Sequence, residues 1–204
     1  NAIYVPGWLP AVEPASQITC PSLEETAKRA LAIMGVAIYS ECLLDEKQGV
    51  EKAQNFLMDY IDNNNTQDYF SPREWRYLHD TAPDRKEVLS FLRQYESLYV
   101  VEWALGLVEE LGFPDHPCNP ADLVKSLRNG TSISKIMAKS RPKSPRELLD
   151  ACDLISCLEW SCINARRHEL PEPAGMKTGV VREWHKALNW LTGHGQWDEV
   201  RANS

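Results

Sequence analysis

The stretch DRKEVLSFLRQYESLYVVEWALGLVEEL, residues 84–111, decides how this chain folds. Its apolar residues return every three or four positions, which is the period of an α-helix with one buried face. The members of this face are Leu89, Leu92, Tyr99, Val100, Trp103 and Leu107. Gly112 and Pro114 follow directly and are typical stop signals. We therefore predict a central helix from Asp84 to Leu111, about 40 Å long at roughly 1.5 Å per residue.

Similar patterns predict helices in the rest of the chain. Ser22 with Glu25 forms a capping box before an apolar face, and serine or asparagine followed by proline starts other helices. The other expected helices cover residues 22–44, 50–61, 71 onward, 119–129, 132–139, 144–168 and 178–192. No segment alternates with a period of two, so we predict an all-α fold of about seven to eight helices around the central one.

The composition is that of one domain with a core of ordinary size. Of 204 residues, 43% are hydrophobic and 25% are charged, as in soluble proteins. We expect residues 22–204 to form a single helical domain and residues 1–21 to form an extended arm, with Asn1 and Ala2 as the remnant of an expression tag. The formal net charge of −7 argues against nucleic acids and anionic membranes as partners, and no apolar run is long enough to span a bilayer.

The cysteines and the missing motifs limit the chemistry. Cys152, Cys157 and Cys162 are five residues apart, which turns each about 140° from the last on a helix, so they cannot share one metal ion. We expect reduced thiols in a cytoplasmic protein that uses no metal and no cofactor. A removed N-terminal signal segment is the alternative to this location. The sequence contains no phosphate-binding loop, zinc-protease motif or nucleophile elbow.

Polar residues interrupt the apolar faces of three helices. Glu96 lies within the inward face of the central helix, where an unpaired carboxylate would be costly. Arg166 continues the inward face of the helix at 144–168, so we predict an ion pair between Glu96 and Arg166. His185 and Asn189 lie one turn apart on a flank of the last helix. A structural role for such groups is more common than a functional one.

Three segments together resemble a known family. They are YESLYVVEWALGLVEELGFP at 95–114, LEWSCINARRHELPEPAG at 158–175 and GVVREWHKALNWLTGHGQWDEV at 179–200. They are similar to the bacterial domain of unknown function 4272 family, which implies a compact helical protein without an assigned activity. The family-like positions of this chain are the polar residues Glu96, Arg166, Glu183, His185, Asn189 and Asp198 and the aromatic residues Trp103, Trp160, Trp190 and Trp197.

These ten residues are the candidate site. We expect them in a groove between the central helix and the last two helices, where the protein binds a protein or small-molecule partner. Gly193 and Gly195 are expected to reverse the chain and return Trp197 and Asp198 to the body. The alternative function is a hydrolase-like or lyase-like enzyme with Glu96 or His185 as general base. A structural oligomer without a ligand is a third hypothesis, and both monomer and homodimer stay open.

Overall fold

The computed structural model describes residues 3, 18–45, 47, 49–128 and 132–201. Its described part is all-α, as the sequence predicts, and contains no strand. The predicted extended arm, residues 1–21, lies mostly outside the described residues, and so does the expected tag remnant at residues 1 and 2.

The described part contains nine α-helices and two short 3-10 helices. In chain order they are α1 (Leu23–Leu43), α2 (Gly49–Asn64), η1 (Gln67–Tyr69), α3 (Pro72–Leu78), α4 (Arg85–Leu92), α5 (Gln94–Ala104), α6 (Pro120–Arg128), α7 (Ile133–Lys139), α8 (Pro145–Arg167), η2 (Pro173–Gly175) and α9 (Thr178–Leu191). Complete capping boxes at Ser22, Ser71 and Ser144 start α1, α3 and α8. The predicted starts of these three helices are confirmed.

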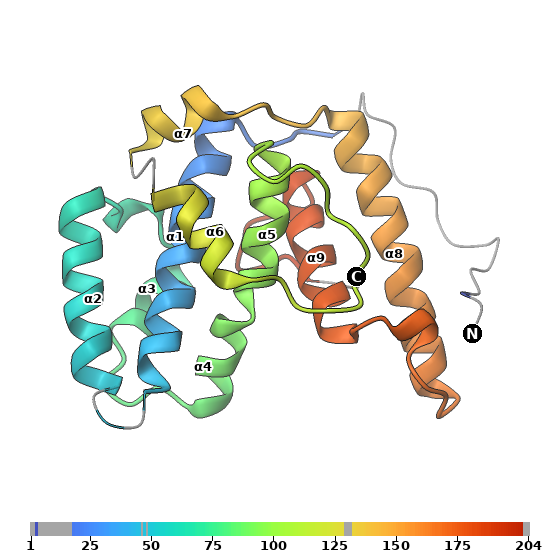
Figure 1. Cartoon of the computed structure of the whole chain (residues 1–204), viewed down its shortest axis with the longest axis horizontal. Coiled ribbons are helices and arrows are strands. Elements are labelled where there is room, and N and C mark those ends of the chain that lie inside the picture. Colours follow the sequence, from blue (N-terminus) through green and yellow to red (C-terminus); the bar gives the residue numbers. More distant parts are fainter. Residues whose placement is uncertain (1–2, 4–17, 46, 48, 129–131, 202–204) are drawn as a thin grey trace.

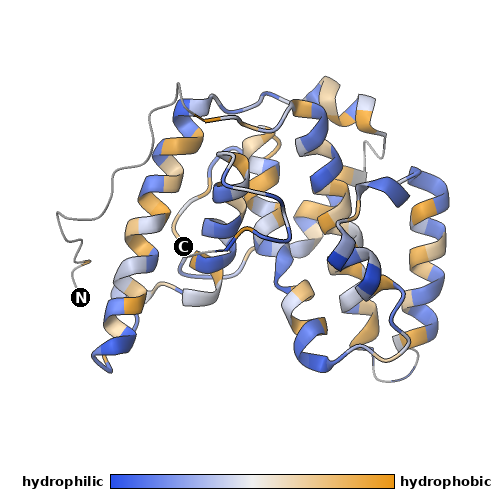
Figure 2. Cartoon of the chain, turned by 180° about the vertical axis from the view of Figure 1, so that it is seen from behind, coloured by the Kyte–Doolittle hydropathy of each residue, from blue (hydrophilic) through white to orange (hydrophobic). Residues whose placement is uncertain are grey.

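Five of the helices lie side by side in a row. Figure 1 shows the order α2, α1, α5, α9 and α8, and each helix of this row contacts the next. On the row, α4 and α7 pack against α1, while α6 packs against α5. Apolar and polar residues alternate along the helices, as expected where one face is buried (Figure 2). The central place predicted for residues 84–111 therefore belongs to α5.

The predicted central helix is wrong in its length. It is interrupted at Arg93, between α4 and α5, and ends at Ala104 instead of Leu111. Gly106 ends it, because its φ of 71° reverses the chain and lets the amide of Leu107 donate to the carbonyl of Glu102 at 2.9 Å. A Cβ atom on Gly106 would lie 2.1 Å from the carbonyl oxygen of Arg141, so a side chain is excluded there. The interruption accounts for the ninth helix.

Three groups of buried apolar side chains hold the helices together. The first lies among α1, α2, α3 and α4 and includes Tyr77 and Phe91. The second joins α1, α5, α6 and α7 and includes Trp197 from beyond α9. The third joins α5, α8 and α9 and includes Trp103 and Trp184. None of the helices described has both the length and the apolar character needed to cross a membrane.

Candidate functional site

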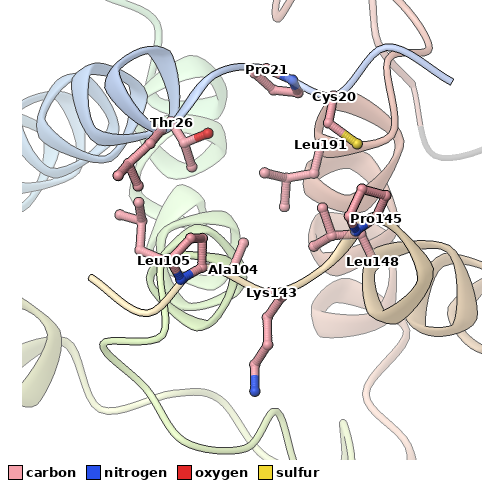
Figure 3. A pocket seen from close by; sticks show the side chains of 11 residues that line it. Cys20, Pro21, Thr26, Ala104, Leu105, Lys143, Pro145, Leu148 and Leu191 are labelled. Atoms are coloured by element: carbon pink, nitrogen blue, oxygen red, sulfur yellow. The ribbon is translucent and has the colours of Figure 1, made fainter. Parts of the chain in front are cut away.

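The ten candidate residues do not line one groove. The third apolar core fills the space between α5, α8 and α9, where the groove was predicted. A pocket of about 220 Å³ remains between the ends of α5 and α9 and the starts of α1 and α8, and apolar side chains such as Ala104, Leu148 and Leu191 line it (Figure 3). None of the ten candidates is among its lining residues, and the side chain of Lys143 points away from the apolar ones (Figure 3). The candidates are instead divided among separate contacts.

Glu96 is buried on α5, as predicted, but its partners are neutral. Its Oε1 atom accepts a hydrogen bond from the backbone amide of Cys118 at 2.8 Å, and its Oε2 atom accepts one from the indole of Trp184 at 3.1 Å. Arg166 is exposed near the end of α8, and the described ion pairs do not join it to Glu96. The predicted Glu96–Arg166 pair is therefore wrong. Burial, with Glu96 nearby, raises the pKa of the Cys118 thiol and keeps it protonated.

Glu183 and two of the tryptophans also have structural contacts. The carboxylate of Glu183 accepts a hydrogen bond from the Ser97 hydroxyl at 2.9 Å, which ties α9 to α5. Trp103 is buried in the third core, with the Nζ atom of Lys143 at 5.4 Å from its ring centroid. Trp160 is half-buried on α8. These three candidates do not meet in a common cavity with Glu96.

The interface between α8 and α9 contains a continuous run of polar contacts. We call it the polar seam and define it by Cys152, Ser156, Glu159, Arg182, His185 and Asn189. The Nδ1 atom of His185 lies 2.5 Å from Oε2 of Glu159, and its Nε2 atom lies 2.8 Å from the hydroxyl oxygen of Ser156. Glu159 has no exposed surface, and its Oε1 atom lies 3.5 Å from Nε of Arg182. His185 was expected in one groove with Glu96, but it faces α8.

Asn189 continues the polar seam by one further turn. Its side-chain oxygen accepts a hydrogen bond from the Cys152 thiol at 3.3 Å, and its amide nitrogen donates to the carbonyl of Arg201 at 3.0 Å. All six cysteines of the chain are free thiols. Although histidine, cysteine and glutamate occur together here, the described residues contain no group of three such side chains that could hold a metal ion.

The segment after α9 turns back onto the protein, as predicted. Gly193 and Gly195 have φ values of 85° and 124°, and a Cβ atom on Gly193 would lie 2.6 Å from the carbonyl oxygen of Thr19. Trp197 is buried and packs edge-on against Trp190 at 5.7 Å between ring centroids. Asp198 accepts hydrogen bonds from the Ser71 hydroxyl at 2.6 Å and from the Arg73 amide at 2.9 Å. Its carboxylate therefore caps the start of α3.

The same segment forms one wall of an open cleft of about 760 Å³, which we call the C-terminal cleft. The opposite wall consists of the first turns of α1, the 3-10 helix η1 and the start of α3. Three of the candidate residues line it, namely Trp190, Trp197 and Asp198. Lys28, Arg29, Asp68, Tyr69 and Glu199 line it as well. The cleft is the one described cavity that gathers several of the predicted residues.

A buried charged cluster lies beside this cleft. We call it the cleft cluster and define it by Arg29, Glu74, Lys186 and Trp197. Arg29 and Glu74 form an ion pair between α1 and α3, in which Arg29 is 6% exposed and Glu74 is fully buried. Three atoms of the cluster have no hydrogen-bond partner among the described residues and almost no exposed surface: Nε of Arg29, Oε1 of Glu74 and Nε1 of Trp197. Native proteins leave few buried polar atoms in this state.

Two cations of the cleft cluster lie over the indole of Trp197. The guanidinium carbon of Arg29 is 4.7 Å from the ring centroid, and Nζ of Lys186 is 4.3 Å from it. Burial lowers the pKa of Lys186, and the nearby cations of Arg29 and Arg73 lower it further, while Glu183 and Glu74 oppose the shift. Two basic side chains therefore contact the Trp197 ring, and Glu74 pairs with one of them.

The sequence did not indicate Arg29, Glu74 or Ser156 as site residues. Arg29 lies beside the inward face predicted for the first helix, and such a position is normally exposed. In the structure α1 lies between α2 and α5 and is covered by α4 and α7, so nearly its whole circumference is buried. A charged residue in the otherwise apolar run at 29–38 was the available signal.

The fold and the cleft define an all-α protein with one polar cleft formed by its C-terminal turn. The family model described as "Domain of unknown function (DUF4272)" matches residues 1–200, so the chain belongs to this family. The predicted resemblance is confirmed. No curated protein and no solved structure matches the chain.

Proposed function

We propose that this protein binds a peptide-like ligand in the C-terminal cleft. The observation that carries the proposal is the pair of buried N–H donors at the cleft, Nε of Arg29 and Nε1 of Trp197, which have no acceptor in the described part of the chain. Leaving a buried donor unpaired costs about 1–3 kcal/mol. A ligand in the cleft that accepts hydrogen bonds from both donors would remove this cost.

The charges of the cleft indicate what the ligand carries. The unpaired donors and the cations of Arg29 and Lys186 favour an oxyanion near Trp197. Asp68 and Glu199 are exposed carboxylates on the same cleft and favour a positive group at its rim. A ligand with a carboxylate at one end and an ammonium group at the other, such as an amino acid or a short peptide, satisfies both.

The aromatic side chains supply the apolar contacts. Tyr69, Trp190 and Trp197 all line the cleft, and the edge-on packing of the two indoles leaves little freedom to either ring. Lys28 is held over Tyr69, with Nζ at 5.6 Å from the ring centroid, and forms an ion pair with Glu24 at 2.6 Å. A site built from such restrained side chains loses little entropy on binding.

The test uses the dipeptide alanyl-alanine with a free C-terminal carboxylate and the same dipeptide amidated there. We expect the free form to raise the unfolding temperature of the full chain by several degrees at saturating concentration and the amidated form to leave it unchanged. Trp197→Phe should abolish the shift, whereas Trp160→Phe, on α8, should retain it. The proposal fails if the free dipeptide gives no shift, or if Trp197→Phe responds like the wild type.

We further propose that residues 22–204 form one domain and that the protein works in the cytoplasm. The second core shares α1 with the first core and α5 with the third, which supports one cooperative unit. The six free thiols support a reducing compartment. Monomer and homodimer are both compatible with a ligand site within one chain.

A further inference from the structure

Ser156 directs its hydroxyl to a neighbouring helix, whereas several other hydroxyl-bearing residues in the helices bond to their own backbone. Ser40, Ser161 and Thr192 each donate to the carbonyl four residues earlier, at 2.8, 3.1 and 2.8 Å, which is the usual arrangement in a helix. The hydroxyl of Ser156 instead lies 2.8 Å from Nε2 of His185 on the neighbouring helix. This contact joins a hydroxyl group to a base.

The second nitrogen of His185 fixes the role of the first. Nδ1 lies 2.5 Å from Oε2 of Glu159, and a carboxylate at this position takes the N–H side of the ring. With the N–H on Nδ1, Nε2 is the unprotonated nitrogen and accepts a hydrogen bond from the Ser156 hydroxyl. Arg182 lies 3.5 Å from the other oxygen of Glu159 and so holds the carboxylate in place. Hydroxyl, imidazole and carboxylate are connected in the order that activates a serine nucleophile.

Ser156, His185 and Glu159 differ in burial, as a serine nucleophile requires: the base and the carboxylate are shielded and the hydroxyl is accessible. Glu159 has no exposed surface and His185 is 7% exposed, so their hydrogen bond is shielded from water. Ser156 is half-buried and accessible from solvent. Arg182 is 54% exposed and lies one turn before His185 on α9, so the ion pair that it forms with Glu159 is at the solvent side of this interface.

We infer that Ser156 is a nucleophile toward carboxylic esters, with His185 as its general base and Glu159 as a positioning residue. In the first step Oγ of Ser156 bonds to the ester carbonyl carbon while its proton moves to Nε2 of His185. The carbon–oxygen bond to the alcohol then breaks, and the alcohol leaves with that proton. Water next attacks the acyl-serine, transferring one proton through His185 back to Oγ, and the carboxylic acid is released.

This site is separate from the C-terminal cleft. His185 and Ser156 lie in the α8–α9 interface, whereas the cleft is lined from α1, η1, α3 and the segment after α9. The inference therefore does not rest on the proposed ligand, and either can fail without the other.

The experiment treats the full chain with a fluorophosphonate reagent and locates the modified residue by mass spectrometry. We expect modification at Ser156. The Ser156→Ala variant should lose it, and Ser161→Ala, a change on the same helix, should not. His185→Ala should slow labelling about 100-fold, the typical contribution of a general base, and added imidazole should restore part of the rate. Circular dichroism confirms that each variant is folded.

Glu159 is tested by a conservative replacement. Glu159→Ala should lower the labelling rate of Ser156. Glu159→Asp should have a higher rate than Glu159→Ala, because it keeps a carboxylate that can bond to His185. If Glu159 served packing alone, the shorter aspartate would not restore the rate. Hydrolysis of p-nitrophenyl acetate should follow the same order across the variants. The inference is overturned if Ser156 stays unmodified in the folded wild type under excess reagent, or if its labelling rate is independent of His185.

Discussion

Two buried groups of polar side chains lie on two sides of α9 and differ in how their hydrogen bonds are used. In the polar seam against α8, both ring nitrogens of His185 and both amide atoms of Asn189 are bonded within the protein. In the cleft cluster against α1 and α3, Arg29, Glu74 and Trp197 each keep one buried polar atom unpaired among the described residues.

The polar seam, with its bonded groups, and the cleft cluster, with its unpaired groups, are suited to different functions. Groups that react with one another must be held together before a substrate arrives, so a bonded serine, histidine and carboxylate are compatible with chemistry. Groups that bind a ligand must keep capacity for it, so unpaired donors beside a cleft are compatible with binding. The unpaired atoms of the cleft cluster lower the stability of the fold, and functional sites commonly have such a cost.

The largest effect is expected from removing Arg29 of the cleft cluster, with Arg182 of the polar seam as the comparison. Arg29→Ala should lower the free energy of unfolding by about 3–5 kcal/mol, because it leaves the carboxylate of Glu74 buried and uncompensated. Arg182→Ala should cost less than about 1 kcal/mol, because Arg182 is half-exposed and Glu159 keeps His185. Urea unfolding measures both. Equal losses would show that the two groups are energetically alike.

Glu102 limits the comparison, because it too has an unpaired buried oxygen among the described residues, although it lines none of the cavities described above. Burial raises its pKa to about 8, although the Ser126 hydroxyl opposes this, so the folded protein keeps it protonated at neutral pH. The unfolded chain ionises near its ordinary value of 4.5, so wild-type stability should fall by about 1.4 kcal/mol per pH unit between that value and about 8.

Glu102→Gln should remove this pH dependence and be more stable than the wild type by a few kcal/mol at pH 8 and not at pH 4. The exposed Glu110→Gln is the control. Chemical unfolding over the pH range decides the matter: a wild-type slope that persists in Glu102→Gln would assign the dependence to another group.

Two tryptophans provide a matched pair of intermediate effect. Trp184 and Trp197 are each 5% exposed, but only the indole N–H of Trp184 has a partner, Glu96. Phenylalanine removes similar volume at both positions, so the loss should be about 1–3 kcal/mol larger at Trp184, where it also leaves an oxygen of Glu96 unpaired. Thermal unfolding of Trp184→Phe and Trp197→Phe compares them, and a larger loss at Trp197 would remove the basis of the binding proposal.

The smallest effect is expected at the cap of α3. Asp198→Ala should cost about 1 kcal/mol, the usual contribution of a helix N-cap, because Ser71 and Arg73 lose their acceptor. The neighbouring exposed Glu199→Ala should change stability by less than about 0.5 kcal/mol. Differential scanning calorimetry resolves the two, and identical traces would show that Asp198 does not hold the turn on α3.

The helices were predictable from the sequence, because their signals are local. Ser71 and Ser144 each precede proline and a glutamate three residues on, and both start helices as predicted. The end of α5 was not predictable in the same way. Gly106 is required by the close carbonyl of Arg141, a contact between segments distant in sequence. The return of Trp197 and Asp198 was predictable from two glycines, but not where they would dock.

The sequence indicated which polar residues lie in apolar faces, but it did not indicate the partners that they contact. Glu96 needed a donor, as its place in an apolar face indicated, yet it found the Cys118 amide and the Trp184 indole in place of Arg166. Backbone amides and indoles carry no charge signal in a sequence. Ser156 was not distinguishable from any other helical serine, because its contact depends on how α8 lies against α9.

The cap of α3 by Asp198 also bears on the order in which the protein can be completed during synthesis. The Ser71 hydroxyl and the Asp198 carboxylate are 127 positions apart, and Arg29 likewise receives Trp197 only from the far end of the chain. A ribosome makes the N-terminal part first. The contacts of α1 and α3 are therefore complete only after residues 197 and 198 have been synthesised. In a chain halted after α9, Arg29 and the start of α3 would lack these partners.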